Sequence, residues 1–124
     1  MLAAVGAILV GLVALEHIYI LYLEMFAWTT PRVQQIFGTT ARFAQETRAL
    51  AANQGLYNGF LAAGLCWGLV HPQAGVGIQV QFFFLLCVLV AAIYGSLTVK
   101  LSIAVVQGGP ALLALVALLA QSLT

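Results

Sequence analysis

The stretch LAAVGAILVGLVALEHIYILYLEMFAW, residues 2–28, decides the fold of this chain. A membrane-spanning helix needs about 20 mostly apolar residues, and this stretch is longer, with ionisable side chains only at Glu16, His17 and Glu24. No positively charged segment precedes its apolar run and no clear cleavage site follows it. We therefore interpret it as a retained membrane helix rather than a signal peptide.

The composition of the whole chain also indicates a membrane protein. Of its 124 residues, 64% are hydrophobic and 6% are charged, whereas a soluble domain carries roughly 25% charged residues. The formal net charge of +1 does not give the basic surface that nucleic-acid binding requires. Cys66 and Cys87 lie in apolar runs without metal-ligand spacing, and we interpret them as small buried hydrophobic residues.

Further apolar runs predict three more spans. We expect an all-α protein, a polytopic four-helix transmembrane bundle in a single domain, with spans at residues 2–28, 51–70, 78–98 and 101–123. The Pro and Gly content of residues 71–77 predicts a turn. The turn before the last span is placed at Lys100. The alternative is QGGP, residues 107–110, which would leave a short last helix.

The polar segment 29–50 separates the first two spans. Its second half, from about Thr40, is predicted as a helix that continues into the membrane. Arg42 and Glu46 are spaced i,i+4, as a pair on a helix surface would be.

The four basic residues predict the orientation. Arg32, Arg42 and Arg48 precede the second span, and Lys100 precedes the fourth. Four crossings place both segments on one side, which the positive-inside rule makes cytoplasmic. We expect a multi-pass protein of the bacterial cytoplasmic (inner) membrane, with segment 29–50 in the cytoplasm and both termini outside.

Three ionisable groups share one face of the first span. At about 100° per residue, His17 lies about 100° and Glu24 about 80° from Glu16. A charge at the bilayer centre costs about 2.5–3.5 kcal/mol on insertion scales, so we expect these side chains to turn into the protein. A functional interpretation is that they bind the polar head of a ligand or transfer a proton. The structural alternative is that they form hydrogen bonds between helices and fix the packing of the bundle.

Other spans supply further polar groups at similar depth. Asn53, Tyr57 and Asn58 occupy the cytoplasmic third of the second span. At a rise of about 1.5 Å per residue, Tyr94 and Gln107 each lie about 9 Å inward from Lys100. We expect one cavity that opens to the cytoplasm and is lined by Glu16, His17, Glu24, Asn53, Tyr57, Asn58, Tyr94 and Gln107.

Small residues predict how the helices pack. Gly55 and Gly59 form a GxxxG on the second span, which lets helix backbones approach closely and makes this face a candidate contact for a second copy of the chain. Residues 108–110, GGP, predict a kink in the last span, because proline removes a helix hydrogen bond. A kink there would leave room for a ligand.

No metal or cofactor is expected. A histidine with two glutamates can ligate iron or zinc, but bundle metal sites usually carry Glu-x-x-His, and neither glutamate stands in that relation to His17. A haem would find only His17 as an axial ligand. The chain also lacks a nucleotide-binding loop, a nucleophile elbow and a CxxC motif.

Three long strings resemble the domain-of-unknown-function 1304 family, which are small bacterial integral membrane proteins with four predicted spans. They are LEHIYILYLEMFAWTTPR, LAANQGLYNGFLAAGLCWGL, and YGSLTVK followed by VQGGPALLAL. The resemblance covers nearly the whole chain and implies the same architecture, but it implies no chemistry. By this resemblance the family's motif-like segments contain Glu16, His17, Glu24, Asn53, Gln54, Gly55, Tyr57, Asn58, Gln107 and Pro110.

Three functions stay open on this pattern. The leading hypothesis is a small integral membrane protein that binds a lipophilic or polar-headed small molecule in its intramembrane pocket. The second is a membrane-embedded, isomerase-like enzyme in which His17 and a glutamate exchange protons with a lipid-soluble substrate. The third is a structural bundle or partner subunit assembled through Gly55 and Gly59. Membrane lipids are the other expected partners, and nucleic acid is not one.

Overall fold

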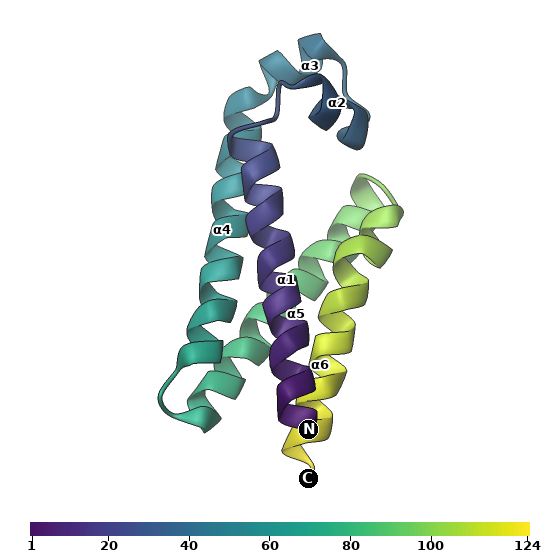
Figure 1. Ribbon diagram of the computed structural model, residues 1–124. Coiled ribbons are helices and arrows are strands. Elements are labelled where there is room, and N and C mark those ends of the chain that lie inside the picture. The colour runs from purple at the N-terminus through teal and green to yellow at the C-terminus, as the bar shows by residue number, and fades with distance from the viewer. The chain divides into compact units, whose positions relative to one another are not determined.

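The computed structural model describes residues 1–124 as helices joined by short turns, without a β-strand (Figure 1). This confirms the all-α class. The helices are α1 (Leu2–Met25), α2 (Pro31–Phe37), α3 (Ala41–Glu46), α4 (Arg48–Val70), α5 (Ala74–Thr98), the π-helix η1 (Ala104–Gly108) and α6 (Gly109–Ser122).

The chain divides into two compact units. Unit 1 comprises Met1–Leu15 and Leu61–Thr124, and unit 2 comprises Glu16–Phe60. Both boundaries fall inside a helix, so α1 and α4 each contribute one half to each unit.

Three stretches are long and apolar enough to cross a membrane: α1, α5, and Ala104–Ser122, which comprises η1 and α6. Helix α4 has 23 residues, about 34 Å at 1.5 Å per residue, and so has the length to cross. Its first half, however, carries the amides Asn53, Gln54 and Asn58, which lower its hydropathy below that of the other three. The fourth span therefore stays a prediction.

Unit 1 has an apolar core to which four helices contribute. In α6 the core residues recur at i, i+3, i+4 and i+7, the spacing of one helix face. The buried members of the core are Val10, Val13, Ala14, Leu65, Leu85, Val88, Ala111, Ala114, Leu115 and Leu118.

Within unit 1, glycines let α4 and α5 approach each other closely. A Cβ atom added at Gly77 would lie 2.5 Å from the carbonyl oxygen of Gly68, and one added at Gly68 would lie 2.9 Å from that of Gly77. A Cβ at Gly64 would overlap the ring of Phe84. The turn between these helices is shorter than predicted, because α5 already begins at Ala74.

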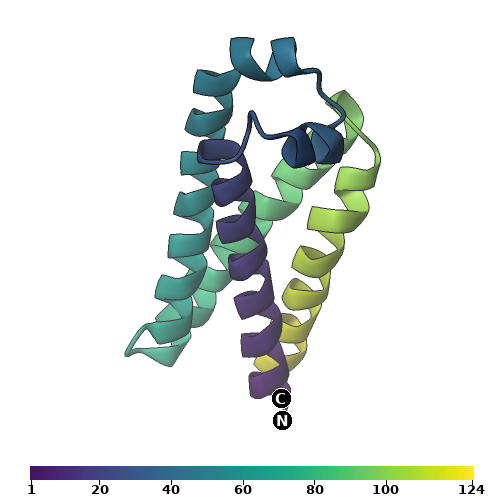
Figure 2. The ribbon, with the colours of Figure 1, turned by 45° about the horizontal axis from the view of Figure 1, so that its top comes forward.

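Helix α5 and the last apolar stretch form a hairpin within unit 1 (Figure 2). Its turn closes when the backbone N–H groups of Val99 and Lys100 both donate to Gly95 O, at 2.9 and 3.2 Å. Of the two predicted alternatives the structure therefore has the turn at Lys100. The alternative turn, residues 107–110, lies instead at the junction where η1 ends and α6 begins. The helix therefore departs from α geometry just before Pro110, where a kink was predicted.

Unit 2 places the second half of α1 beside the first half of α4 (Figures 1 and 2). Two short capped helices connect them. The Thr30 hydroxyl accepts from Val33 N at 3.4 Å to begin α2, and Thr40 does the same for Phe43 N at 3.1 Å in α3. Gly38 ends α2 with φ +68°, a left-handed conformation that glycine adopts without steric cost.

The helix expected to run on from about Thr40 is interrupted. Helix α3 ends at Glu46 and α4 begins at Arg48. Thr47 between them has φ −103° and ψ 5°, and its hydroxyl donates back to Phe43 O at 2.6 Å. The predicted i,i+4 pair is confirmed: Arg42 Nε lies 2.9 Å from Glu46 Oε1, and both side chains are exposed.

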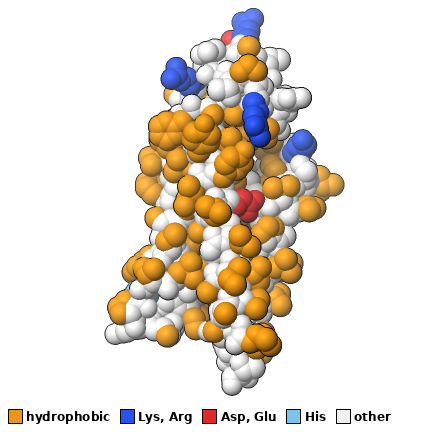
Figure 3. Space-filling view, in the orientation of Figure 1, with side chains coloured by type: hydrophobic (Ala, Val, Ile, Leu, Met, Phe, Trp, Pro, Cys, Tyr) orange, Lys and Arg blue, Asp and Glu red, His pale blue; other side chains and the backbone are white.

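Many large hydrophobic side chains are exposed on the long helices, among them Ile8, Phe60, Val90 and Leu113. Hydrophobic side chains cover much of the face seen in Figure 3, and Lys and Arg side chains appear there at only a few places. Such a surface is what the composition predicted for a protein whose helices contact lipid.

Candidate functional site

The polar centre of unit 2 is the carboxylate of Glu24, in the last turn of α1. This residue is 4% exposed. Asn58 Nδ2 donates to Glu24 Oε2 at 2.9 Å, and Gln54 Nε2 donates to Glu24 Oε1 at 3.4 Å. Gln54 and Asn58 lie four residues apart and so share one face of α4. Each carboxylate oxygen therefore receives one amide N–H from the neighbouring helix.

A glycine lets α4 come this close to the carboxylate. A Cβ atom added at Gly55 would lie 2.7 Å from Met25 Cγ, 3.0 Å from Glu24 Cβ and 3.2 Å from Leu21 O. One turn later, a Cβ at Gly59 would lie 2.6 Å from Leu21 Cδ1. The GxxxG face thus packs α4 on α1 within one chain. Contact with a second copy through this face stays a prediction.

The chemistry of the carboxylate follows from its neighbours, which are neutral. The salt bridge of the chain lies elsewhere, on the surface between Arg42 and Glu46. A hydrogen bond to a charged group contributes about 1.5–3 kcal/mol, so the two amides offset part of the cost of burying this carboxylate. A carboxylate offers about four acceptor positions, of which the two amides fill two. The remaining positions can accept an N–H, an O–H or a cation.

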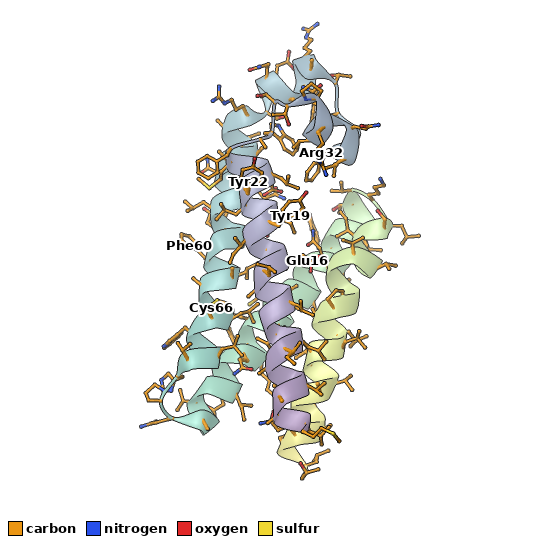
Figure 4. The ribbon with its side chains drawn as sticks, viewed as in Figure 1. Glu16, Tyr19, Tyr22, Arg32, Phe60 and Cys66 are labelled. Carbon is orange, nitrogen blue, oxygen red and sulfur yellow. The ribbon has the colours of Figure 1, made fainter.

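The other ionisable groups of α1 differ in exposure. His17 is 1% exposed and has an interaction partner, whereas Glu16 is only half-buried. Glu16, Tyr19 and Tyr22 follow one another along the helix at intervals of three residues (Figure 4), and both tyrosines are exposed. The structure therefore encloses His17 and Glu24 more completely than Glu16.

Two predicted site residues of α4 do not reach Glu24. Asn53 is exposed, and its Nδ2 donates to Ala49 O of its own helix at 2.9 Å. Tyr57 is 63% exposed, and its ring packs edge-on against Phe60 with 5.9 Å between centroids. Among the α4 residues predicted for the site, only Asn58 contacts the carboxylate.

Gln54 joins the site although it was not predicted as a site residue. On the helical wheel Gln54 lies only about 40° from Asn58. Because the two amides share one face of the helix, the sequence contained a signal for including Gln54 in the site. The two remaining predicted residues belong to unit 1: Tyr94 is exposed on α5, and Gln107 is half-buried in η1.

Unit 1 has a polar groove of its own that the sequence analysis missed. It has a volume of about 200 Å³, and its lining combines the polar side chains of Gln81, His71 and Gln121 with alanine, glycine, leucine and isoleucine residues. Gln81 is buried, and its Nε2 donates to Gly68 O at 3.0 Å. Gln81 is a polar residue in the largely apolar predicted span 78–98. Its position there was the sequence signal for a buried hydrogen bond.

Comparison with known proteins gives two similarities. The model of a family described as "Protein of unknown function (DUF1304)" matches residues 11–119. The uncharacterized protein YpaA of Lactococcus lactis subsp. lactis (strain IL1403) is 37% identical over 107 residues, which cover 85% of this chain and 88% of that protein. No solved structure matches the chain.

Proposed function

This chain belongs to the DUF1304 family, and we propose that it is a membrane protein that binds a lipophilic small molecule through a cationic or N–H-bearing head group at Glu24. The supporting observation is a carboxylate, 4% exposed, whose two hydrogen-bond partners are neutral amides. A positively charged donor would balance the charge and fill the free acceptor positions, and such charge-assisted hydrogen bonds are the stronger ones. The apolar helices around it suit an alkyl chain.

Each neighbour of Glu24 has a separate part in this proposal. Asn58 and Gln54 fix the orientation of the carboxylate, since each donates to a different oxygen. Gly55 brings their helix close enough for these contacts. Glu16 and His17 extend the ionisable face along α1, toward the part of the ligand beyond its head group.

The proposed location is the bacterial cytoplasmic membrane, crossed four times with both termini outside. Three apolar stretches long enough to cross support this location, and α4 has sufficient length. If α4 did not cross, Lys100 would lie on the opposite side from Arg32, Arg42 and Arg48, against the positive-inside rule. Four crossings put all four basic residues on the cytoplasmic side.

The binding proposal is tested with three probes that share one alkyl chain and differ in the head group: octylamine, octanol and octanoate. The full chain is reconstituted in phosphatidylcholine nanodiscs, and the probes are titrated while the side-chain amide resonances of Asn58 and Gln54 are followed by NMR. Octylamine is expected to shift these resonances saturably, whereas octanoate is not, because a second anion beside Glu24 is repelled. Equal shifts with all three probes would overturn the proposal.

Two matched variants locate the binding. Glu24→Gln keeps the shape of the side chain but removes its charge, and we expect octylamine affinity to fall about tenfold or more, the equivalent of one charge-assisted hydrogen bond. Glu46→Gln removes an exposed glutamate that pairs with Arg42, and affinity should not change. Equal loss in both variants would show that octylamine responds only to the total charge.

A further inference from the structure

The connecting segment, residues 29–50, concentrates the positive charge of the chain. It contains three of the four basic residues but only one acidic residue, Glu46. Arg42 is paired with that glutamate, whereas Arg32 and Arg48 are exposed and have no carboxylate partner. Figure 4 shows Arg32 on α2. Two exposed guanidinium groups are therefore free to bind an anion from outside the chain.

Exposed apolar side chains accompany these arginines. Ile36 and Phe37 end α2, and Phe43 lies in α3, and all three are exposed. Large apolar groups interleaved with arginine are typical of segments that lie in the lipid–water interface, where the rings enter the acyl boundary and the charges stay at the head groups. A segment that faced only water would leave these apolar side chains solvated.

Trp28 holds the connecting segment at the end of the apolar helix α1. Its ring packs on Phe37 with 4.9 Å between centroids, and its Nε1 donates to Thr47 Oγ1 at 3.1 Å. These contacts join the end of α2 and the C-cap of α3 to a residue three positions beyond Met25, the last residue of α1. When α1 crosses a bilayer, this level is that of the lipid head groups, where tryptophan is enriched.

We propose that the connecting segment is a binding surface for anionic phospholipid head groups, with Arg32 and Arg48 as the phosphate-binding residues and Trp28 as the interfacial anchor. The guanidinium fork matches phosphate oxygens in a bidentate geometry. Each basic residue near an anionic membrane surface raises association about fivefold. This inference rests on the proposed membrane location but not on a ligand at Glu24.

Trp28 serves as the reporter in the test. The chain has two tryptophans, so Trp67→Phe leaves Trp28 alone. This variant is reconstituted into phosphatidylcholine vesicles that contain an equal minor fraction of either brominated phosphatidylglycerol or brominated phosphatidylcholine, whose bromines quench nearby tryptophan. At equal fractions, we expect brominated phosphatidylglycerol to quench Trp28 more strongly than brominated phosphatidylcholine. The difference should correspond to a severalfold higher local concentration of the anionic lipid around Trp28.

Controls separate a specific surface from a general effect. When Arg32→Gln and Arg48→Gln are added, both lipids should quench Trp28 to the same level. Quenching by brominated phosphatidylcholine should stay unchanged, and this unchanged value reports an intact fold. In the reverse reporter, Trp28→Phe, the exposed Trp67 lies 19 residues beyond Arg48 on the same helix, about 28 Å. It should show no preference for the anionic lipid.

The outcomes distinguish the two proposals. Equal quenching of Trp28 by both lipids, or a preference that survives loss of Arg32 and Arg48, would overturn the anionic-lipid surface alone. Absence of quenching by either lipid would overturn the membrane location as well. High salt should reduce the preference for phosphatidylglycerol, because ions screen exposed charges.

Discussion

The side-chain amide of Asn58 donates a 2.9 Å hydrogen bond to the carboxylate of Glu24, which lies 34 residues earlier in the chain. This contact joins α4 to α1 through polar groups that hydrocarbon cannot satisfy. The hydrogen bond holds the Glu24 carboxylate, whose charge is costly to bury, in a fixed position as an acceptor. The stability of the helix pair should therefore depend on it.

Replacing Asn58 by Leu is expected to lower the free energy of unfolding by about 1–3 kcal/mol, because the buried carboxylate loses its shorter hydrogen bond. Reversible unfolding in mixed micelles, followed by circular dichroism, measures the loss. Asn53→Leu is the matched control on the same helix. Its amide bonds only to Ala49 O and is exposed, so the change should stay within about 0.5 kcal/mol. Similar losses in both variants would contradict the assigned contact.

The two glycines of the GxxxG should respond differently to alanine. At Gly55 the added methyl meets a backbone oxygen, Leu21 O, and the Cβ of Glu24, which cannot move independently of the helix, and we expect a loss of about 1–3 kcal/mol. At Gly59 it meets only the flexible Leu21 Cδ1. There the gain of about 0.5–1 kcal/mol in helix propensity should offset the contact. The same unfolding assay ranks the variants.

A control for this comparison lies in α1. Gly11 has nothing within 4 Å of an added Cβ, so Gly11→Ala should be neutral or stabilising. If Gly55→Ala changed the free energy of unfolding as little as Gly11→Ala does, the close approach of α4 to Glu24 would be wrong.

In unit 1, Gly64→Ala should destabilise the chain by about 1–3 kcal/mol, because the new methyl overlaps the ring of Phe84. Phe84→Leu in the same chain removes the obstructing ring atoms. The double variant should therefore be more stable than Gly64→Ala alone, with a coupling energy of about 0.5–3 kcal/mol. Phe83→Leu changes an exposed neighbour and should not rescue Gly64→Ala.

The number of crossings decides on which side of the membrane the carboxyl terminus lies. With four crossings, alkaline phosphatase fused after Thr124 should be active and green fluorescent protein dark, because only the phosphatase matures outside. Fusions after Lys100 should give the opposite result, since the positive-inside rule places Lys100 in the cytoplasm. If α4 does not cross and segment 29–50 stays in the cytoplasm, both fusion points reverse, and the predicted second span is wrong.

Most of the fold could be predicted because local patterns determine it. The apolar runs at residues 2–28, 78–98 and 101–123 correspond to the three stretches that are long and apolar enough to cross a membrane, and Lys100 marks the turn that the structure has. The ends were less predictable. Helix α3 stops before Thr47, whose hydroxyl donates to Phe43 O and accepts from Trp28. The contact with Trp28 joins residues 19 positions apart, which a local pattern does not reveal.

The candidate site was only partly predictable for a similar reason. Helical angles placed Glu24 on one polar face and Asn58 on another, and these angles are intrinsic to each helix. Which amides of α4 then reach Glu24 depends on how α4 is rotated against α1. Gly55 sets that rotation by its close approach to α1, so Gln54 turns toward the carboxylate while Asn53 bonds to its own helix.

The π-helix at Ala104–Gly108 bears on how the length of this chain can change over evolution. A π-turn takes up one residue more than an α-turn. Loss of one residue there would restore α geometry and keep the turns on both sides in the same phase, so the core positions from Ala111 onward stay on the same helix face. One-residue insertions and deletions in homologous chains should therefore be accommodated at this point, where a switch between π and α geometry leaves the packed face of α6 untouched.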